Sequence, residues 1–168
     1  SVFEGGYRVP AIAWMPGMIE KGTVSTALAS TLDLYPTLIA MAGNENFYKE
    51  ELDGVNITNT FFKNNPVRYD IHYYRQDTLV GIRHKEWKMF IRDPNPWNDD
   101  LRQEDMPVLY NIEHDPSEKY NVADKNSDIV NEILSLSVEH IREVPKAPSQ
   151  YDAILPKYQS AYDAYNKK

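Results

Sequence analysis

The sequence predicts an α/β remnant followed by an α+β subdomain, in which a four-stranded antiparallel sheet is packed by a C-terminal helix. Three patterns support this fold class. An apolar run from Val9 to Met15 precedes a short helical pattern. Apolar residues then recur at every second position between residues 67 and 92, which is the period of β-strands. Residues 127–144 carry a broad apolar stripe at helical spacing.

The first predicted element is a buried strand over Val9–Met15. The glycines Gly5 and Gly6 allow a tight loop before this strand, and the run is hydrophobic on both faces. Such a strand needs neighbours in a sheet that is covered on both sides, and the following chain supplies too few of them. We therefore expect residues 1–60 to belong to the end of an α/β domain and to be poorly stable by themselves.

A short core helix is expected next. Asp33 can cap its N-terminus, Pro36 is tolerated in its first turn, and Gly43 is placed to end it. Its buried face is predicted from residues spaced i, i+4 and i+7, namely Leu34, Leu38 and Met41. The segment Asn44–Asn65 has no clear periodicity, so it is predicted to be a surface connection.

The sheet is predicted to be an antiparallel meander. Period-two patterns cover residues 67–74, 78–83 and 87–92, and residues 108–113 can form a fourth strand. The tripeptides Arg75-Gln76-Asp77 and His84-Lys85-Glu86 between the first three strands are of hairpin length.

One helix is predicted to cover this sheet over residues 127–144. Its apolar stripe consists of Ile129, Val130, Ile133, Leu134, Leu136, Ile141 and Val144. The tail from Pro145 places Tyr158, Tyr162 and Tyr165 at helical spacing, which predicts a docked terminal helix.

Composition excludes several classes of function. The net charge is −7, whereas nucleic acid and anionic membranes both require a basic face, so neither is expected as a partner. The chain has no cysteine, which excludes disulfides, thiol catalysis and Cys-ligated zinc. No apolar run approaches the roughly 20 residues that a membrane helix needs.

Four short motifs occur in a fixed order along the chain. They are Glu4-Gly5-Gly6-Tyr7-Arg8-Val9-Pro10 with Pro16-Gly17, then Leu32-Asp33-Leu34-Tyr35-Pro36-Thr37, then Leu52-Asp53-Gly54, and finally Leu109-Tyr110-Asn111 with Asp115-Pro116-Ser117-Glu118. In sequence and order they resemble motifs of the type I, formylglycine-dependent sulfatases of the alkaline-phosphatase-like superfamily. The resemblance extends from the first residue to about Asn121.

The resemblance also implies what the chain does not contain. In the family, the residue oxidised to formylglycine, the calcium-binding carboxylates and most sulfate-contacting residues precede the first motif, and a sulfate-binding lysine lies shortly before the position of Ser1. Calcium and formylglycine are therefore the implied cofactors, with their ligands outside this chain. Residues 1–65 are expected to be the C-terminal portion of the catalytic α/β sulfatase domain, and residues 66–168 a C-terminal α+β subdomain with a terminal tail.

No catalytic or metal site is expected within the chain itself. The histidines His72, His84, His114 and His140 show no metal-ligand spacing. Nothing resembles a nucleophile elbow. Glu4 and Arg8 are interpreted as an ion-paired brace of their loop. Because the resemblance places them near the active-site wall, an indirect role stays open.

One candidate substrate-binding rim follows from the meander. Successive turns alternate between the two ends of a meander, so the turn at Arg75 and the long loop Asp93–Asp105 should lie at the same end. This places Arg75, Trp97 and Arg102 at one rim. Arginine offers a planar donor fork for sulfate or carboxylate, and an exposed tryptophan offers a platform for a sugar. Alternatively, Trp97 anchors its loop to the core.

The resemblance thus implies the C-terminal portion of a sulfuric ester hydrolase that acts on sulfate monoesters of a small molecule or, more specifically, a carbohydrate. Two alternatives remain: a phosphate or phosphonate monoesterase of the same superfamily, and a non-catalytic binding module. The chain alone is expected to be inactive, and the upstream part of the same sulfatase is its expected partner. Family members are mostly exported, which implies a periplasmic, lysosomal or extracellular location.

Overall fold

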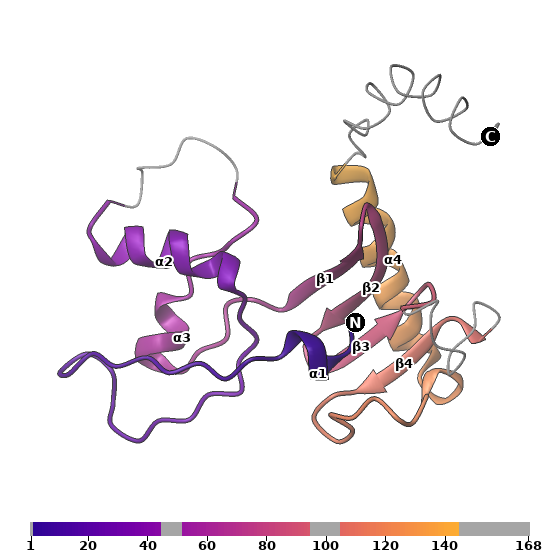
Figure 1. Ribbon diagram of the computed structural model, residues 1–168, viewed down its shortest axis with the longest axis horizontal. Coiled ribbons are helices and arrows are strands. Elements are labelled where there is room, and N and C mark those ends of the chain that lie inside the picture. The colour runs from indigo at the N-terminus through magenta and orange to yellow at the C-terminus, as the bar shows by residue number, and fades with distance from the viewer. Residues whose placement is uncertain (1, 45–51, 95–104, 145–168) are drawn as a thin grey trace, which may run out of the picture. The chain divides into compact units, whose positions relative to one another are not determined.

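A computed structural model describes residues 2–44, 52–94 and 105–144 (Figure 1). Its contacts divide the chain into two compact units, Ser1–Ser137 and Val138–Lys168. The helices are α1 (Glu4–Tyr7), α2 (Leu34–Met41), α3 (Thr58–Lys63) and α4 (Ser127–Glu143), and the strands are β1 (Asp70–Arg75), β2 (Thr78–His84), β3 (Trp87–Phe90) and β4 (Val108–Asn111). Within these described ranges, no helix combines the length and the apolar composition that crossing a membrane requires.

The predicted meander is confirmed. The sheet has four strands in the order β1-β2-β3-β4, and every neighbouring pair is antiparallel. The β1–β2 and β2–β3 hairpins close through Gln76 and Lys85, which adopt left-handed φ angles of 55° and 53°. β1 begins at Asp70, three positions later than predicted, and a register shift follows Tyr73.

Each face of the sheet buries a separate apolar cluster. On one face, Val80, Phe90 and Tyr110 pack with Val2 and Phe3 from the start of the chain. On the other face, Ile82, Met89 and Leu109 pack with Ile133 of α4 (Figure 1). Alternation alone would put Val80 and Ile82 on the same face of β2, but the register shift after Tyr73 leaves Val80 without a partner in β1 and allows these two residues to enter different cores. The N-terminal segment covers one of the two cores.

The buried apolar stripe of α4 is narrower than predicted and also shorter, because its apolar contacts with the sheet end at Leu136. Ile133 is fully buried, and Ile129, Val130 and Leu136 pack beside it. Leu134, Ile141 and Val144 are 38%, 52% and 50% exposed, which corrects the prediction for these positions. A helix turns about 100° per residue, so Leu134 points well away from Ile133. The predicted terminal helix over the tail from Pro145 lies outside the described residues.

The predicted strand over Val9–Met15 is wrong. This segment has no regular structure, and Ile12 and Trp14 are 97% and 84% exposed. A strand requires a partner for its backbone N–H and C=O groups, and no described segment of the chain pairs with residues 9–15. The glycine pair instead lies in the short helix α1.

The bounds of the helix near Asp33 are confirmed, but its predicted buried face is wrong. Gly43, at a φ of 79°, follows α2 as expected. Leu34, Leu38 and Met41 are 45%, 59% and 36% exposed, whereas Pro36 and Thr37 are buried. Thr37 faces the segment that follows Asp53, because its hydroxyl accepts a hydrogen bond of 2.9 Å from the amide of Ile57.

The segment Asn44–Asn65 is more than a surface connection, which corrects the prediction. It contains α3, and Ile57 at the start of this helix is only 1% exposed. Asp33 also departs from its predicted role, because its side chain does not cap α2. It closes a capping box with Ser30 on the 3-10 turn Thr31–Asp33 that precedes α2.

Candidate functional site

A buried ion cluster joins α1 to the sheet. It consists of Glu4 from α1, Arg83 from β2, Lys88 from β3 and Glu118 from the segment after β4, and we call it the Lys88 cluster. Lys88 is 0% exposed, and Glu4 and Glu118 are 4% and 8% exposed. With Lys88 and Arg83 opposite two carboxylates, the cluster is formally neutral, as a buried group of charges must nearly be.

The ammonium group of Lys88 is surrounded by acceptors. Its Nζ donates to Val2 O at 2.9 Å and to Glu4 Oε1 at 3.0 Å, and it lies 2.9 Å from Glu118 Oε1. Glu118 also accepts a hydrogen bond of 2.6 Å from the backbone amide of Glu4. The face of the Tyr73 ring, whose centroid is 4.3 Å from Nζ, completes the environment.

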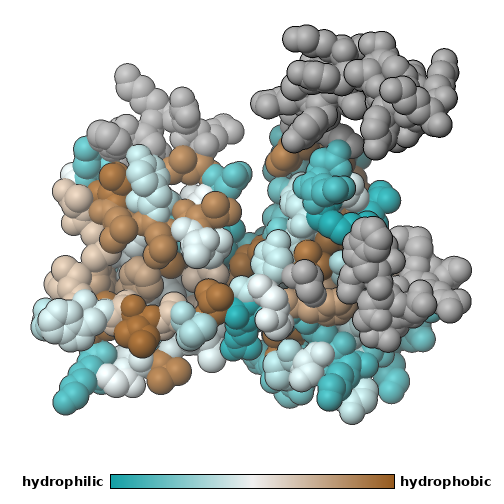
Figure 2. Space-filling model, in the orientation of Figure 1, coloured by the Kyte–Doolittle hydropathy of each residue, from teal (hydrophilic) through white to brown (hydrophobic). Residues whose placement is uncertain are grey.

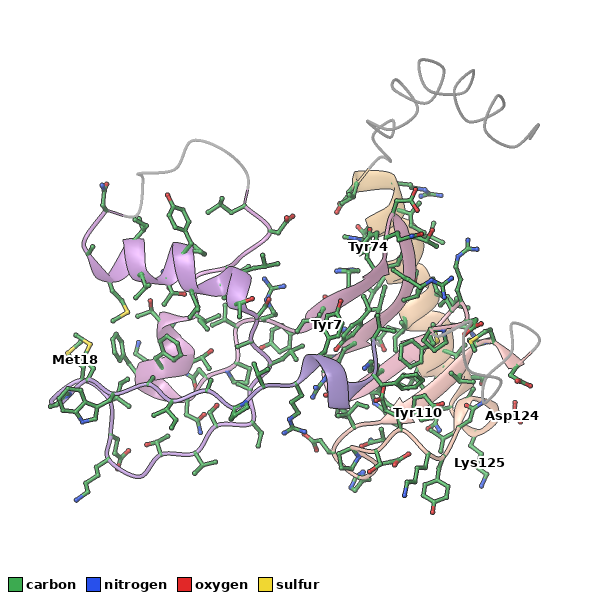
Figure 3. All side chains as sticks on the ribbon, in the orientation of Figure 1. Tyr7, Met18, Tyr74, Tyr110, Asp124 and Lys125 are labelled. Carbon is green, nitrogen blue, oxygen red and sulfur yellow. The ribbon has the colours of Figure 1, made fainter. Side chains whose placement is uncertain are left out.

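Tyr73 forms one wall of the Lys88 cluster. Its hydroxyl donates to Glu4 Oε1 at 3.3 Å. Burial, together with the negative charge of Glu4, raises the pKa of Tyr73 well above its ordinary value, so the phenol remains a neutral donor. The ring of Tyr7, labelled in Figure 3, packs edge-on against Tyr73 at 5.0 Å and is 49% exposed.

This geometry corrects the prediction that Glu4 and Arg8 form an ion pair that braces their loop. Glu4 is braced, but its cationic partners are Lys88 and Arg83, at 3.0 and 3.1 Å. Arg8 is exposed, and its backbone amide closes the α1 turn on Glu4 O at 2.8 Å. A partner from the sheet replaces a neighbour in sequence because α1 packs its first residue, rather than its last, against β3.

A second buried network joins the Asp33 and Leu52-Asp53-Gly54 motifs. Asp33 is 0% exposed and binds Arg68 through both carboxylate oxygens. Arg68 Nη2 also donates to Asp53 O at 2.8 Å. Gly54 lies so close to Leu32 that a Cβ on Gly54 would be 2.0 Å from Leu32 O, so only glycine fits there.

The charged motif residues are therefore cross-links of the fold. Glu4, Asp33 and Glu118 are each buried against a cation from elsewhere in the chain, and none is open to a substrate. Across residues 2–44, 52–94 and 105–144, no group of three or more His, Asp or Glu side chains could hold a metal ion. The described part of the chain thus does not supply the calcium site that the family implies.

The predicted rim is only partly described. Arg75 ends β1, is half-buried, and donates from Nη1 to Asp93 O at 2.8 Å. The turn at Arg75 and the start of the long loop therefore do lie together. Trp97 and Arg102 lie outside the described residues.

Sequence reasoning missed Lys88, which it assigned only to the alternating pattern of a strand. The available signal was a lysine inside the apolar run Trp87-Lys88-Met89-Phe90, at the position that shares a face with buried Phe90.

Sequence reasoning also missed the structural role of His84. Its ring lies between two carboxylates, with Nδ1 2.5 Å from Asp70 Oδ1 and Nε2 3.2 Å from Glu132 Oε1, and so it links β1 to α4.

Comparison with known proteins gives consistent matches. A family model, the C-terminal region of aryl-sulfatase, matches residues 67–164. N-acetylgalactosamine-6-sulfatase of Mus musculus is 28% identical over 168 residues, which are 88% of this chain and 32% of that protein. Arylsulfatase A of Bos taurus is 29% identical over 92% of this chain and 33% of its own length.

A solved structure from Bacteroides thetaiotaomicron, described as a 6S-sulf protein in the metabolism of multiple glycosaminoglycans, superposes with a TM-score of 0.56. It is 26% identical and covers 71% of this chain and 26% of its own. The chain thus spans about a third of the length of the curated relatives it matches.

Proposed function

The chain belongs to the sulfatase family, whose C-terminal region it matches, and from this premise we propose that it forms the C-terminal portion of an enzyme that hydrolyses sulfate monoesters. The observation that carries the proposal is the match of the aryl-sulfatase model to residues 67–164, the part that builds the sheet and α4. The substrate proposed is a sulfated carbohydrate, since the relative first described acts, by its name, on N-acetylgalactosamine-6-sulfate.

The proposed division of labour assigns the chemistry to the rest of a longer protein. Residues 1–65 would complete a catalytic α/β domain, and residues 66–168 would form the C-terminal subdomain. The formylglycine and calcium of the family would lie in the remainder, which is also the proposed partner of this chain. The family resemblance further supports an exported protein, in periplasm, lysosome or cell exterior.

The exposed apolar surface supports this division. Between residues 9 and 41, large apolar side chains such as Ile12, Trp14 and Leu38 are 97%, 84% and 59% exposed. Figure 2 shows hydrophobic residues gathered over the part of the molecule that contains α2. Contiguous exposed apolar surface usually marks a contact with another protein surface, and here we propose the remainder of the catalytic domain as that surface.

The rim of Arg75, Trp97 and Arg102 is proposed to contact the carbohydrate away from the sulfate group. Arg75 is held at the base of the loop by its hydrogen bond to Asp93 O, which supports its place at that rim. A guanidinium can bind an acidic group of the sugar through paired hydrogen bonds.

The function is tested by hydrolysis assays on the natural full-length protein and on the 168-residue chain, with calcium added. We expect the full-length protein to hydrolyse an aryl sulfate faster than the matching aryl phosphate, and the chain alone to hydrolyse neither. Faster phosphate hydrolysis would assign a phosphatase of the same superfamily. Turnover by the chain alone, co-purifying with it, would overturn the division of labour, and no hydrolysis by any sample would indicate a binding module.

A further inference from the structure

We infer, resting on the proposed function, that Lys88 is a positioning residue: it holds the exposed Glu4–Arg8 turn at a fixed place on the C-terminal sheet, so that this turn forms part of the substrate site. Lys88 itself cannot touch substrate, because its side chain is 0% exposed. Its effect must pass through the backbone and side chain that it binds.

The turn is anchored at its first residues and exposed beyond them. Lys88 binds Val2 O and the Glu4 carboxylate, and Glu118 binds the Glu4 amide. Within the turn, Gly6 N donates to Phe3 O at 2.9 Å and Arg8 N to Glu4 O at 2.8 Å. From Gly5 to Arg8 every residue is exposed. Hydrogen bonds within the turn fix its backbone conformation, and the Lys88 cluster fixes its position on the sheet.

The cluster contributes position more than stability. A buried ion cluster is often no more stabilising than apolar residues of the same volume, because desolvation of its charges offsets their attraction. Apolar anchoring is already present on this face, where Val2 is buried and Phe3 packs edge-on against Phe90 at 5.1 Å. Apolar contacts are not directional, whereas the hydrogen bonds from the Lys88 ammonium group to Val2 O and to the Glu4 carboxylate fix the distance and direction at which the turn begins.

The side chains that the turn presents suit an anionic sugar. Arg8 places an exposed cation on a chain whose net charge is −7, and Tyr7 exposes 49% of its surface while Tyr73 supports its ring. A cation can meet the sulfate or a carboxylate, and an aromatic ring can pack against a sugar face. Such groups contribute more to a substrate site when their position is fixed before binding, because less entropy is lost when the substrate binds.

The experiment uses the natural full-length protein with the quadruple substitution Lys88→Met, Arg83→Gln, Glu4→Gln and Glu118→Gln, which replaces all four members of the cluster. This variant removes the buried charges and keeps the side-chain volumes, so we expect its melting temperature to stay within a few degrees of wild type. We expect amide hydrogen exchange in the peptide covering residues 2–9 to accelerate at least tenfold, and kcat/KM for a sulfated carbohydrate to fall at least tenfold. Lys85→Gln, an exposed position on the next turn, is the control for both measurements.

A second variant is used in case the quadruple variant does not fold. Arg83→Gln acts at the edge of the cluster, where the side chain is 14% exposed, and should change both measurements in the same direction by a smaller factor. Unchanged exchange at residues 2–9 in every folded variant would overturn the positioning role. Faster exchange with an unchanged kcat/KM would contradict the proposal that the turn forms part of the substrate site.

The exchange measurement does not depend on activity. If the wild-type protein hydrolyses no sulfate ester, the proposed function fails, and with it the substrate part of this inference. Faster exchange in the variants would even then support Lys88 as the anchor of the turn. The two failures are therefore distinguishable.

Discussion

The guanidinium of Arg68 forms a bidentate ion pair with the buried carboxylate of Asp33, with Nε 2.9 Å from Oδ2 and Nη2 2.5 Å from Oδ1. The same carboxylate accepts hydrogen bonds from the amides of Ser30 and Val55, at 2.7 and 2.9 Å. Asp33 is 0% exposed, and both of its carboxylate oxygens thus accept hydrogen bonds from protein donors. The network connects the 3-10 turn before α2, the segment around Gly54 and the chain entering β1.

Asp33→Asn should lower the free energy of unfolding by about 3–5 kcal/mol, because it leaves the charge of Arg68 without its partner in a mostly buried place. Lys85→Gln is the control, since Lys85 is exposed and 3.9 Å from Glu132, and should cost less than about 1 kcal/mol. Chemical denaturation of the full-length protein measures both. A loss for Asp33→Asn no larger than for the control would show that Arg68 finds water instead.

Gly54→Ala should be destabilising by at least about 2 kcal/mol, because the new Cβ would lie 2.0 Å from Leu32 O and the backbone would have to move. Gly5→Ala is the matched control, as nothing lies within 4 Å of its added Cβ. Alanine is also the better helix former in α1. Thermal melts compare the two, and equal losses would contradict the close packing of Gly54 on Leu32.

The sheet and α4 could be predicted because their patterns are local. Alternation with a period of two and hairpin turns of minimal length define a meander, and Ile133 at the centre of a helical stripe identifies the covering helix. The run Val9–Met15 failed for the opposite reason. Its apolar residues predict burial, but what buries them is not set by the run itself, and no described segment pairs with it.

The Lys88 cluster could not be predicted from spacing. Lys88 lies 84 positions from Glu4 and bonds to it in the core, whereas Arg8 is four positions away and offers the same charge. Sequence proximity favours the local pair, and tertiary packing reverses that choice. Glu4, Asp33 and Glu118 each belong to one of the four motifs, and each is buried. Their role as cross-links could not be predicted from the sequence, because their partners lie far away in the chain.

Ile133→Asp should cost several kcal/mol, because it places an unpaired carboxylate among Leu79, Met89 and Leu109. Asn131→Asp introduces the same side chain two positions earlier on the exposed side of α4 and should cost little. Melting temperatures of the full-length variants test the phase of the helix. Similar losses for the two variants would show that the buried side of α4 has been misplaced.

Alkaline pH should destabilise the protein partly through Tyr110. Burial, followed by the negative charges of Glu118 and Asp115, raises the pKa of Tyr110 to about 12 from its ordinary 10.0. The folded state then holds the phenolic proton more tightly than the unfolded state, so this stability is fully present below pH 10 and is lost as the pH rises towards 12.

The measurement is the melting temperature between about pH 8 and pH 11, where the decline should be shallower in Tyr110→Phe than in wild type. Ultraviolet titration of the phenolate should show the corresponding group near pH 12 only in wild type. Parallel declines in the two proteins would contradict the assignment to Tyr110.

Arg75 allows the sharpest test of the proposed rim, because its single described role is structural. It donates to Asp93 O at 2.8 Å, so a loss of activity in Arg75→Ala could come from a displaced loop as well as from a lost substrate contact. The variant Arg75→Lys distinguishes a displaced loop from a lost substrate contact. Lysine can still donate to the carbonyl, but it lacks the planar fork that binds an acidic group in two places.

If Arg75 binds the sugar, Arg75→Ala and Arg75→Lys should both reduce kcat/KM for the natural sulfated carbohydrate by about 10- to 100-fold, as expected for roughly 1–3 kcal/mol of contacts. Trp97→Ala and Arg102→Ala should show the same pattern, and Lys125→Ala on the exposed turn before α4 should not. A small aryl sulfate, which reaches only the sulfate pocket, should react at the wild-type rate with every variant. Full recovery in Arg75→Lys would assign Arg75 to loop placement, and equal losses on both substrates would assign it to folding.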